Sequence, residues 1–120
     1  MKKSPFKFRH ALLLLVTILA VNARNLADWV FDDIRESRGR EDLRELSKRI
    51  ESYRNNRGSY PTTEQGLDSL VAIIKLVPSD PWGNKYCYRL LDDGGKHPFE
   101  VLSAGPDGIH GNEDDLSSIN

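Results

Sequence analysis

Helical periodicity in residues 25–56 is the feature that most constrains how this chain can fold. Basic and acidic residues are interleaved there, and apolar residues recur every three or four positions instead of alternating. These apolar positions are Leu26, Val30, Ile34, Leu43, Leu46, Ile50 and Tyr53. The spacing predicts a long helix with a narrow apolar stripe, better packed in its C-terminal half. Gly39 costs about 1 kcal/mol relative to alanine inside a helix and favours a division of this helix into two.

A short apolar run precedes this helix. It begins at Ala11 and ends at Val21, and its eleven residues, at about 1.5 Å each, fall short of the roughly 30 Å hydrocarbon core of a bilayer. The residues before it include Lys2, Lys3, Lys7 and Arg9. The basic start, the short run and the small side chain of Ala23 together match a signal peptide cleaved after Ala23. The alternative is an uncleaved signal anchor whose helix continues to Phe31. Both interpretations place the rest of the chain outside the cytoplasm.

After Tyr60 the chain changes to short elements separated by turns. Thr62 and Gln65 have the spacing of a capping box, and apolar residues in 67–74 predict a helix of two to three turns before Pro78. The sequence of residues 80–83, Asp-Pro-Trp-Gly, predicts a type I turn.

Two segments of alternating residues then predict a pair of antiparallel strands. Tyr86, Tyr88 and Leu90 alternate with polar residues in the first segment, and residues 99–103 form the second. A turn at residues 92–95 joins them. The predicted fold class is therefore α+β, with a long N-terminal α-helix packed on a small antiparallel β-sheet. Residues 1–23 form the export segment, and residues 24–120 form one domain.

Charge and cysteine content narrow the functional classes. The chain carries 17 Lys and Arg residues against 18 Asp and Glu residues, a net charge of −1 that does not indicate a nucleic-acid partner. The acidic residues dominate the second half, where residues 61–120 hold ten of them and four basic residues. Cys87 is the single cysteine and cannot form an intrachain disulfide, so an exported domain must be stabilised by its core or by a metal.

The histidines do not form a catalytic pattern in the sequence. His10 lies in the export segment, His97 precedes a proline, and His110 lies among glycines and acids. None is placed beside a nucleophile and an orienting acid. We therefore expect no enzymatic activity and no small-molecule substrate.

The acidic segment of residues 104–115 carries the clearest chemistry. It contains three glycines and four carboxylates, with no lysine or arginine among them. Ca²⁺ takes six to eight oxygen ligands from carboxylates and backbone carbonyls, which suits such a loop. The spacing is not that of an EF-hand, and zinc is disfavoured because His110 is the one nitrogen ligand nearby. The alternatives are a solvated acidic loop, or a side chain of Asp107 that caps its own turn.

Three sequence blocks resemble the major pseudopilin, the G subunit, of type II secretion systems. They are residues 60–67 (YPTTEQGL), residues 80–84 (DPWGN), and residues 103–108 (SAGPDG) with Asp114 and Asp115. The resemblance implies a domain in the bacterial periplasm with one structural Ca²⁺, bound by three aspartates with spacings of seven and one. Asp107, Asp114 and Asp115 have that spacing. The resemblance also assigns backbone carbonyl ligands, which fall on Ala104, Pro106 and Ile109.

The N-terminal segment departs from the pattern of this family. Pseudopilins have a glycine before the first mature residue and a glutamate five residues into an apolar stretch, whereas here no glycine precedes Gly39 and no acid precedes Asp28. Two functions follow. The first is a structural subunit that acts with other pseudopilins or secretion-system components, with inner-membrane attachment through the apolar run. The second is a cleaved, soluble periplasmic calcium-binding module that binds an exported protein or a secretion component.

Overall fold

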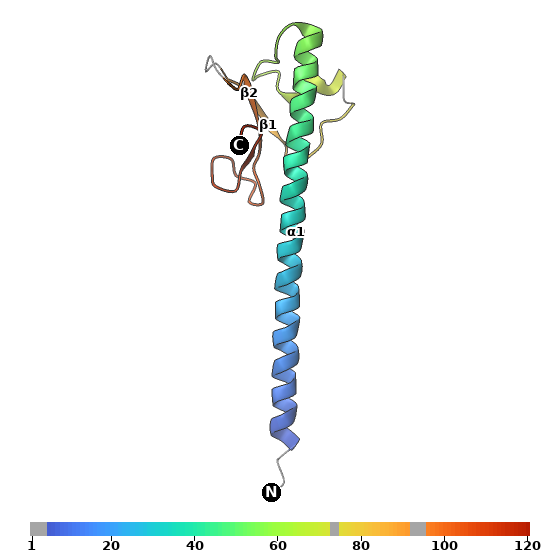
Figure 1. The fold of residues 1–120 in the computed structure, drawn as a ribbon, viewed down its shortest axis with the longest axis vertical. Helices are drawn as coiled ribbons and strands as arrows, with labels where there is room; N and C mark the ends of the chain where they lie inside the picture. Colours follow the sequence, from blue (N-terminus) through green and yellow to red (C-terminus); the bar gives the residue numbers. More distant parts are fainter. Residues whose placement is uncertain (1–4, 73–74, 92–95) are drawn as a thin grey trace. The chain divides into compact units, whose positions relative to one another are not determined.

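The computed structural model describes residues 5–72, 75–91 and 96–120. The described elements are the α-helix α1 (Pro5–Arg57), the 3₁₀ helix η1 (Leu67–Ala72) and the strands β1 (Cys87–Leu90), β2 (Phe99–Ser103) and β3 (Leu116–Ser117) (Figure 1). The chain divides into two compact units, Met1–Ile34 and Arg35–Asn120, and α1 contributes to both. The predicted fold class, a long helix with a small antiparallel sheet, is confirmed.

The first unit contains the apolar part of α1. Its large apolar side chains between Leu12 and Val21 are all more than half exposed, and Leu26, Trp29 and Phe31 follow them with 59–65% exposure. The helix contains an 18-residue window with a mean hydropathy of 1.5, which makes it long and apolar enough to cross a membrane. The apolar run is thus part of a helix that extends beyond it on both sides.

The predicted division of the helix at Gly39 is wrong, because α1 is a single helix through this position. Gly39 is buried, and a Cβ placed on it would lie 2.7 Å from Cδ1 of Leu116. The absence of a side chain therefore lets β3 approach the helix closely. Packing against Leu116 offsets the low helix propensity of glycine. The sequence pattern does not reveal this packing, because Leu116 is distant in the chain.

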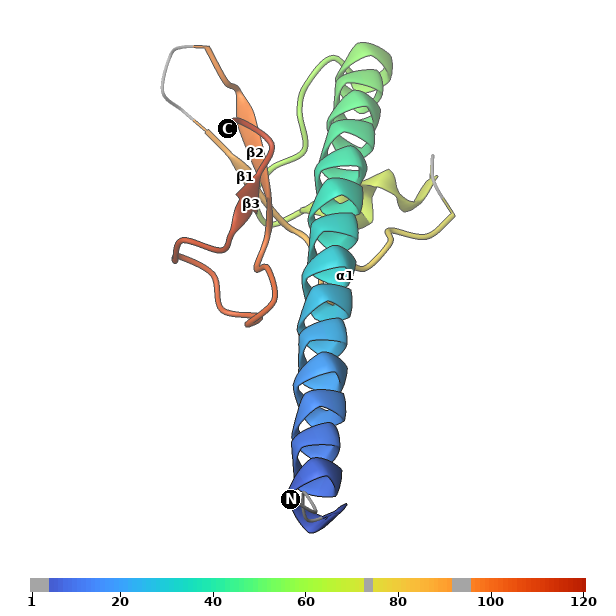
Figure 2. The ribbon, with the colours of Figure 1, turned by 60° about the horizontal axis from the view of Figure 1, so that its bottom comes forward.

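The second unit holds a three-stranded antiparallel sheet in the order β1-β2-β3 (Figure 2). Tyr88 pairs with Val101 between β1 and β2, and Ser103 pairs with Leu116 between β2 and β3. The predicted bounds of β2 are confirmed. The first strand begins at Cys87, one residue after Tyr86, and β3 was not predicted, because two residues carry no readable alternation.

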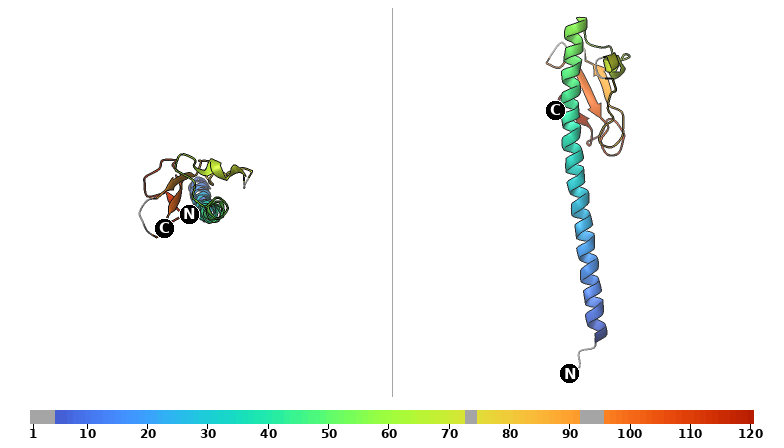
Figure 3. Two further views of the ribbon diagram at one scale, coloured as in Figure 1. Left: turned by 90° about the horizontal axis from the view of Figure 1, so that it is seen from above. Right: turned by 90° about the vertical axis from the view of Figure 1, so that its right-hand side faces the viewer.

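The hydrophobic core of this unit lies between the C-terminal part of α1 and the sheet, which run beside each other in Figure 3. Its buried members are Leu43, Leu46, Ile50, Leu67, Leu70, Tyr86, Tyr88, Phe99, Val101 and Leu116. The predicted better packing of the C-terminal half of the helix is therefore confirmed. Leu90 was expected on the buried face of its strand, but it is 40% exposed near the end of the strand.

Most of the short elements predicted after Tyr60 are confirmed. The backbone N–H of Thr62 donates to Oε1 of Gln65 (2.9 Å), and the N–H of Gln65 donates to Oγ1 of Thr62 (3.2 Å), as in a capping box. The helix that follows is η1, a 3₁₀ helix instead of an α-helix, and residues 73–74 lie outside the described residues. The turn at Asp80 is closed by the N–H of Gly83 (2.9 Å), whereas the predicted turn at residues 92–95 lies outside the described residues.

Candidate functional site

The acidic loop, residues 104–115, connects β2 to β3. The pairing of Ser103 with Leu116 brings the two ends of the loop together. As a result, Asp114 and Asp115 at the end of the loop return to the vicinity of Ala104 and Gly105 at its start. Sheet pairing, which the sequence did not reveal, is what closes this loop.

The six predicted calcium ligands differ in their exposure. Ala104 is buried (1% exposed), Asp114 and Asp115 are half-buried, and Asp107, Pro106 and Ile109 are exposed. All six lie on this one loop, whose two ends the sheet holds together.

Asp107 organises the turn in which it lies. Its Oδ1 accepts the backbone N–H of Ile109 (2.8 Å), and its Oδ2 accepts Nδ2–H of Asn112 (2.6 Å). The backbone N–H of Asp107 donates to Oδ2 of Asp114 (3.3 Å). The turn cap by Asp107, which the sequence offered as an alternative to a calcium site, is therefore present in the structure, and the bond from Asp107 to Asp114 connects two of the three predicted ligands.

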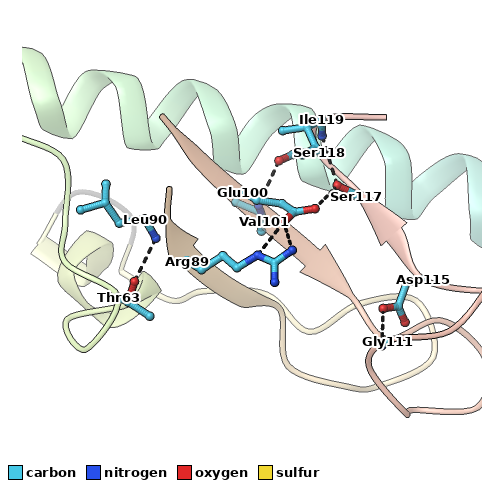
Figure 4. A network of polar contacts seen from close by, with 10 residues as sticks. All are labelled: Thr63, Arg89, Leu90, Glu100, Val101, Gly111, Asp115, Ser117, Ser118 and Ile119. Atoms are coloured by element: carbon cyan, nitrogen blue, oxygen red, sulfur yellow. Dashed lines mark hydrogen bonds and ion pairs between the residues drawn. The ribbon is translucent and has the colours of Figure 1, made fainter. Parts of the chain in front are cut away.

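The two carboxylate oxygens of Asp115 differ in their hydrogen bonds. Its Oδ2 accepts the backbone N–H of Gly111 (2.7 Å; Figure 4). Its Oδ1 is buried and finds no hydrogen-bond partner among the residues that the structure describes. A buried carboxylate oxygen without a partner is costly, by about 1–3 kcal/mol or more, and a cation would satisfy it.

Gly105 lets the two ends of the loop approach each other. Its φ is +63°, and a Cβ at this position would collide with the carbonyl oxygen of Asp114 and lie 2.9 Å from Oδ2 of Asp114. Any other residue would be strained in this backbone conformation and would push the Asp114 carboxylate away. The close approach of Asp114 to the start of the loop therefore requires a glycine at this position.

The chemistry of the loop fits a hard cation. Carboxylate and carbonyl oxygens are the donors that Ca²⁺ takes in a flexible loop, and the partnerless Oδ1 of Asp115 offers one of them. Within residues 5–72, 75–91 and 96–120, no three His, Cys, Asp or Glu side chains converge on one point. Both oxygens of Asp107 and Oδ2 of Asp115 accept hydrogen bonds from N–H groups of the loop, whereas Oδ1 of Asp115 is available to an ion.

Sequence reasoning missed the residues that support this loop from outside. Asp80 is 4% exposed, and its carboxylate accepts hydrogen bonds from the backbone N–H groups of Trp82 (3.1 Å) and Asn84 (2.7 Å). Asn84 in turn donates Nδ2–H to the carbonyl of Gly105 (3.1 Å). Residues 80–83 were predicted to form a turn, but the spacing of residues in the sequence does not indicate that Asn84 bonds to the acidic loop.

A separate cluster of polar side chains joins all three strands (Figure 4). Glu100 of β2 is 4% exposed, forms an ion pair with Arg89 of β1 and accepts the hydroxyl of Ser117 of β3 (2.6 Å). The alternation of apolar and polar residues in 99–103 did not predict that Glu100 is buried. Because each of its oxygens has a partner, we assign this cluster to sheet stability.

Comparison with known proteins places this fold and loop in one family. The family model described as type II secretion system (T2SS), protein G, matches residues 30–120, which include the whole Arg35–Asn120 unit. The chain is 38% identical over 92 residues to the type II secretion system core protein G of Escherichia coli (strain K12), which covers 64% of this chain and 62% of that protein. The protein of the same name from Pseudomonas aeruginosa is 29% identical over 126 residues, covering 90% of this chain and 87% of that protein.

A solved structure agrees with the sequence comparisons. The crystal structure of the major pseudopilin from the type 2 secretion system of enterohaemorrhagic Escherichia coli matches with a TM-score of 0.61 and 34% identity, covering 72% of this chain and 87% of that chain. The resemblance drawn from the three sequence blocks is therefore confirmed. Since the family match extends over residues 30–120, this chain belongs to the type II secretion system protein G family.

Proposed function

We propose that this protein is a structural pseudopilin component of a bacterial type II secretion system. The observation that carries the proposal is the family match over residues 30–120, which takes in the C-terminal part of α1, the three strands and the acidic loop. The alignment spans 62% of the length of the Escherichia coli K12 relative, so the role is argued from the domain that is shared. Its action is mechanical, and its partners are other pseudopilins or components of the same system.

The N-terminal part of α1 attaches the protein to the inner membrane in this proposal. Its large apolar side chains are exposed, and the helix is long and apolar enough to cross a bilayer. Lys7 and Arg9 precede the apolar run, which favours an N-terminus on the cytoplasmic side and the Arg35–Asn120 unit in the periplasm.

One Ca²⁺ stabilises the acidic loop in this proposal. The side chains of Asp107, Asp114 and Asp115 would hold it together with the carbonyls of Ala104, Pro106 and Ile109. The support is the partnerless buried Oδ1 of Asp115 and the collection of carboxylates on a loop with no lysine or arginine. The ion would supply a positive charge that removes the repulsion among these carboxylates.

The membrane attachment is tested by determining the mature N-terminus. The full chain with a C-terminal tag is expressed in the bacterium that encodes it, the cell envelope is fractionated, and the purified protein is examined by mass spectrometry. We expect a chain that retains residues 11–21 and sediments with the inner membrane. A chain that begins at Arg24 in the soluble periplasmic fraction would overturn the membrane-attached subunit and support the soluble calcium-binding module.

The role in secretion is tested separately by deleting the gene. We expect export of the substrates of the type II system to fall and to recover when the full chain is supplied in trans. A matched variant, Leu15→Lys, places a charge within the apolar run and should not restore export, because it disfavours residence in the bilayer. Unchanged export in the deletion strain would contradict the proposed function.

A further inference from the structure

Two turns that are distant in the sequence meet through the side chain of Asn84. Nδ2 of Asn84 donates to the carbonyl of Gly105, with a donor–acceptor distance of 3.1 Å. The backbone around Asn84 is itself held by Asp80, whose Oδ1 accepts the N–H of Asn84 (2.7 Å) and whose N–H donates to the carbonyl of Asn84 (2.8 Å). Asp80 therefore holds the backbone from which the Asn84 side chain reaches Gly105.

A second path joins Asp80 to the same glycine. Oδ2 of Asp80 accepts the hydroxyl of Ser103 (2.6 Å), and Oγ of Ser103 accepts the backbone N–H of Gly105 (3.2 Å). Asp80 is 4% exposed and Ser103 is fully buried, so water does not compete for these bonds. Both backbone polar groups of Gly105 are thus held by groups whose orientation depends on Asp80.

These bonds orient the two peptide units that flank Gly105. Because a peptide unit is planar, holding the N–H of Gly105 also fixes the plane of the Ala104 carbonyl. Holding the carbonyl of Gly105 fixes the peptide unit that leads into Pro106. The Ala104 carbonyl, one of the proposed calcium ligands, is thus oriented before any ion binds. The carbonyl of Pro106, another proposed ligand, belongs to the next peptide unit, and only the position of its residue is restrained.

Asn84 also contacts the second glycine turn of the loop. A Cβ on Gly108 would lie 3.1 Å from Oδ1 of Asn84, and Gly108 has a φ of +71°. The amide of Asn84 therefore lies against Gly108 while it bonds to Gly105. Glycines lose more backbone entropy than other residues when they become ordered. Because Asn84 already orders Gly105 and Gly108 in the folded chain, the free-energy cost of ordering the loop around an ion is lower.

We propose that Asn84, oriented by Asp80, is a positioning residue that holds the acidic loop in the conformation that binds Ca²⁺. The inference rests on the calcium site of the proposed function and adds to it a residue outside the acidic loop. Asn84 does not contact the ion. It acts through the backbone of Gly105, and outer residues that orient metal ligands typically change metal affinity by about 10- to 100-fold when they are replaced.

The test is a calcium titration of the full chain in detergent, stripped with a chelator and followed by isothermal titration calorimetry. We expect Asn84→Ala to weaken calcium binding by about tenfold or more. Asn84→Leu keeps the branched shape of the side chain and removes its donor, so it should weaken binding similarly. The control is Thr63→Val, which removes another bond between a side chain and the backbone, one that lies outside the acidic loop. The N–H of Leu90 donates that bond to Oγ1 of Thr63 (3.0 Å; Figure 4), and its loss should leave calcium affinity unchanged.

Amide hydrogen exchange in the calcium-free state separates positioning from general destabilisation. Asn84→Ala and Asn84→Leu should speed exchange at Gly105 and Asp107, while the amides of Tyr88 and Val101 in the sheet exchange as in the wild type. Wild-type affinity in both variants would overturn the positioning role and leave the calcium site standing. A wild-type chain that does not bind calcium would overturn the calcium site itself, and the inference with it.

Discussion

The hydroxyl of Tyr86 donates a 3.0 Å hydrogen bond to Oδ2 of Asp42, which joins α1 to the residue immediately before β1. Tyr86 is 7% exposed. Burial raises the pKa of the Tyr86 hydroxyl above its usual value of 10, and the hydrogen bond to Asp42 and the charge of Asp42 raise it further. The proton therefore stays on the tyrosine, and the bond helps to fix the sheet against the helix within the Arg35–Asn120 unit.

Removing this hydroxyl should destabilise the unit. Tyr86→Phe leaves the ring in the core but takes away the donor to a charged, half-buried acceptor, so we expect the free energy of unfolding to fall by about 1–2 kcal/mol. Chemical denaturation measures the change. A double-mutant cycle with Asp42→Ala should show a coupling of similar size. Additive effects of the two substitutions would contradict the proposed bond.

Gly39→Ala tests the close packing between α1 and β3. Alanine is the better helix former by about 1 kcal/mol, but its Cβ would lie 2.7 Å from Cδ1 of Leu116, and overpacking of a core costs about 1–3 kcal/mol. We expect the free energy of unfolding to fall by about 1 kcal/mol, and the loss to shrink in the Leu116→Val background. Ser37→Ala, at an exposed position of the same helix, is the control and should not destabilise the protein. A clear gain of stability in Gly39→Ala would refute the packing argument.

Calcium removal should loosen the folded domain. An ion that binds only the folded state contributes about 2.7 kcal/mol at a hundredfold excess over its Kd. We therefore expect EDTA to lower the melting temperature of the wild type, measured by circular dichroism or differential scanning calorimetry. Asp107→Ala, Asp114→Ala and Asp115→Ala should each remove the difference between chelated and calcium-loaded samples.

The control for this prediction lies within the same loop. Glu113→Ala removes one of the four carboxylates but lies outside the proposed ligand set, so its response to EDTA should stay close to that of the wild type. Equal responses in Glu113→Ala and the three aspartate variants would point to a general effect of negative charge. An unchanged melting temperature of the wild type on adding EDTA would count against the site.

Alkaline pH should destabilise the domain through Tyr88. Burial, and to a lesser extent Tyr60, raises the pKa of Tyr88 from 10.0 to about 12, and its hydroxyl donates to the carbonyl of Pro61 (2.8 Å). The folded state thus favours the protonated phenol. This contribution is complete below pH 10 and is lost as the pH rises through about 12.

Denaturant unfolding at a series of pH values checks this expectation. The free energy of unfolding of the wild type should decline above pH 10, and the decline should be less steep in Tyr88→Phe, which has no proton to lose. Tyr88→Phe should also be less stable at neutral pH, because it leaves the carbonyl of Pro61 without its donor. Identical slopes in the two proteins would show that other groups cause the alkaline loss.

The sequence predicted correctly those elements that depend on residues close to one another in the chain. The alternation in Phe99–Ser103 predicted β2 with its observed bounds, and the spacing of Thr62 and Gln65 predicted a capping box that the structure contains. The stripe through Leu43, Leu46 and Ile50 likewise predicted the buried face of α1. Each of these features depends on residues a few positions apart, so the spacing of residues in the sequence is enough to predict it.

Features that depend on distant residues were decided by the tertiary structure. Gly39 does not end the helix, because Leu116 packs against it, and β3 exists because Leu116 and Ser117 pair with β2. The sequence alone supplied the family resemblance, the carboxylates of the acidic loop and the oxygen chemistry that suits calcium. Only the fold brings Asn84 to the carbonyl of Gly105, since that bond joins two turns 21 residues apart whose meeting depends on the pairing of β1 with β2.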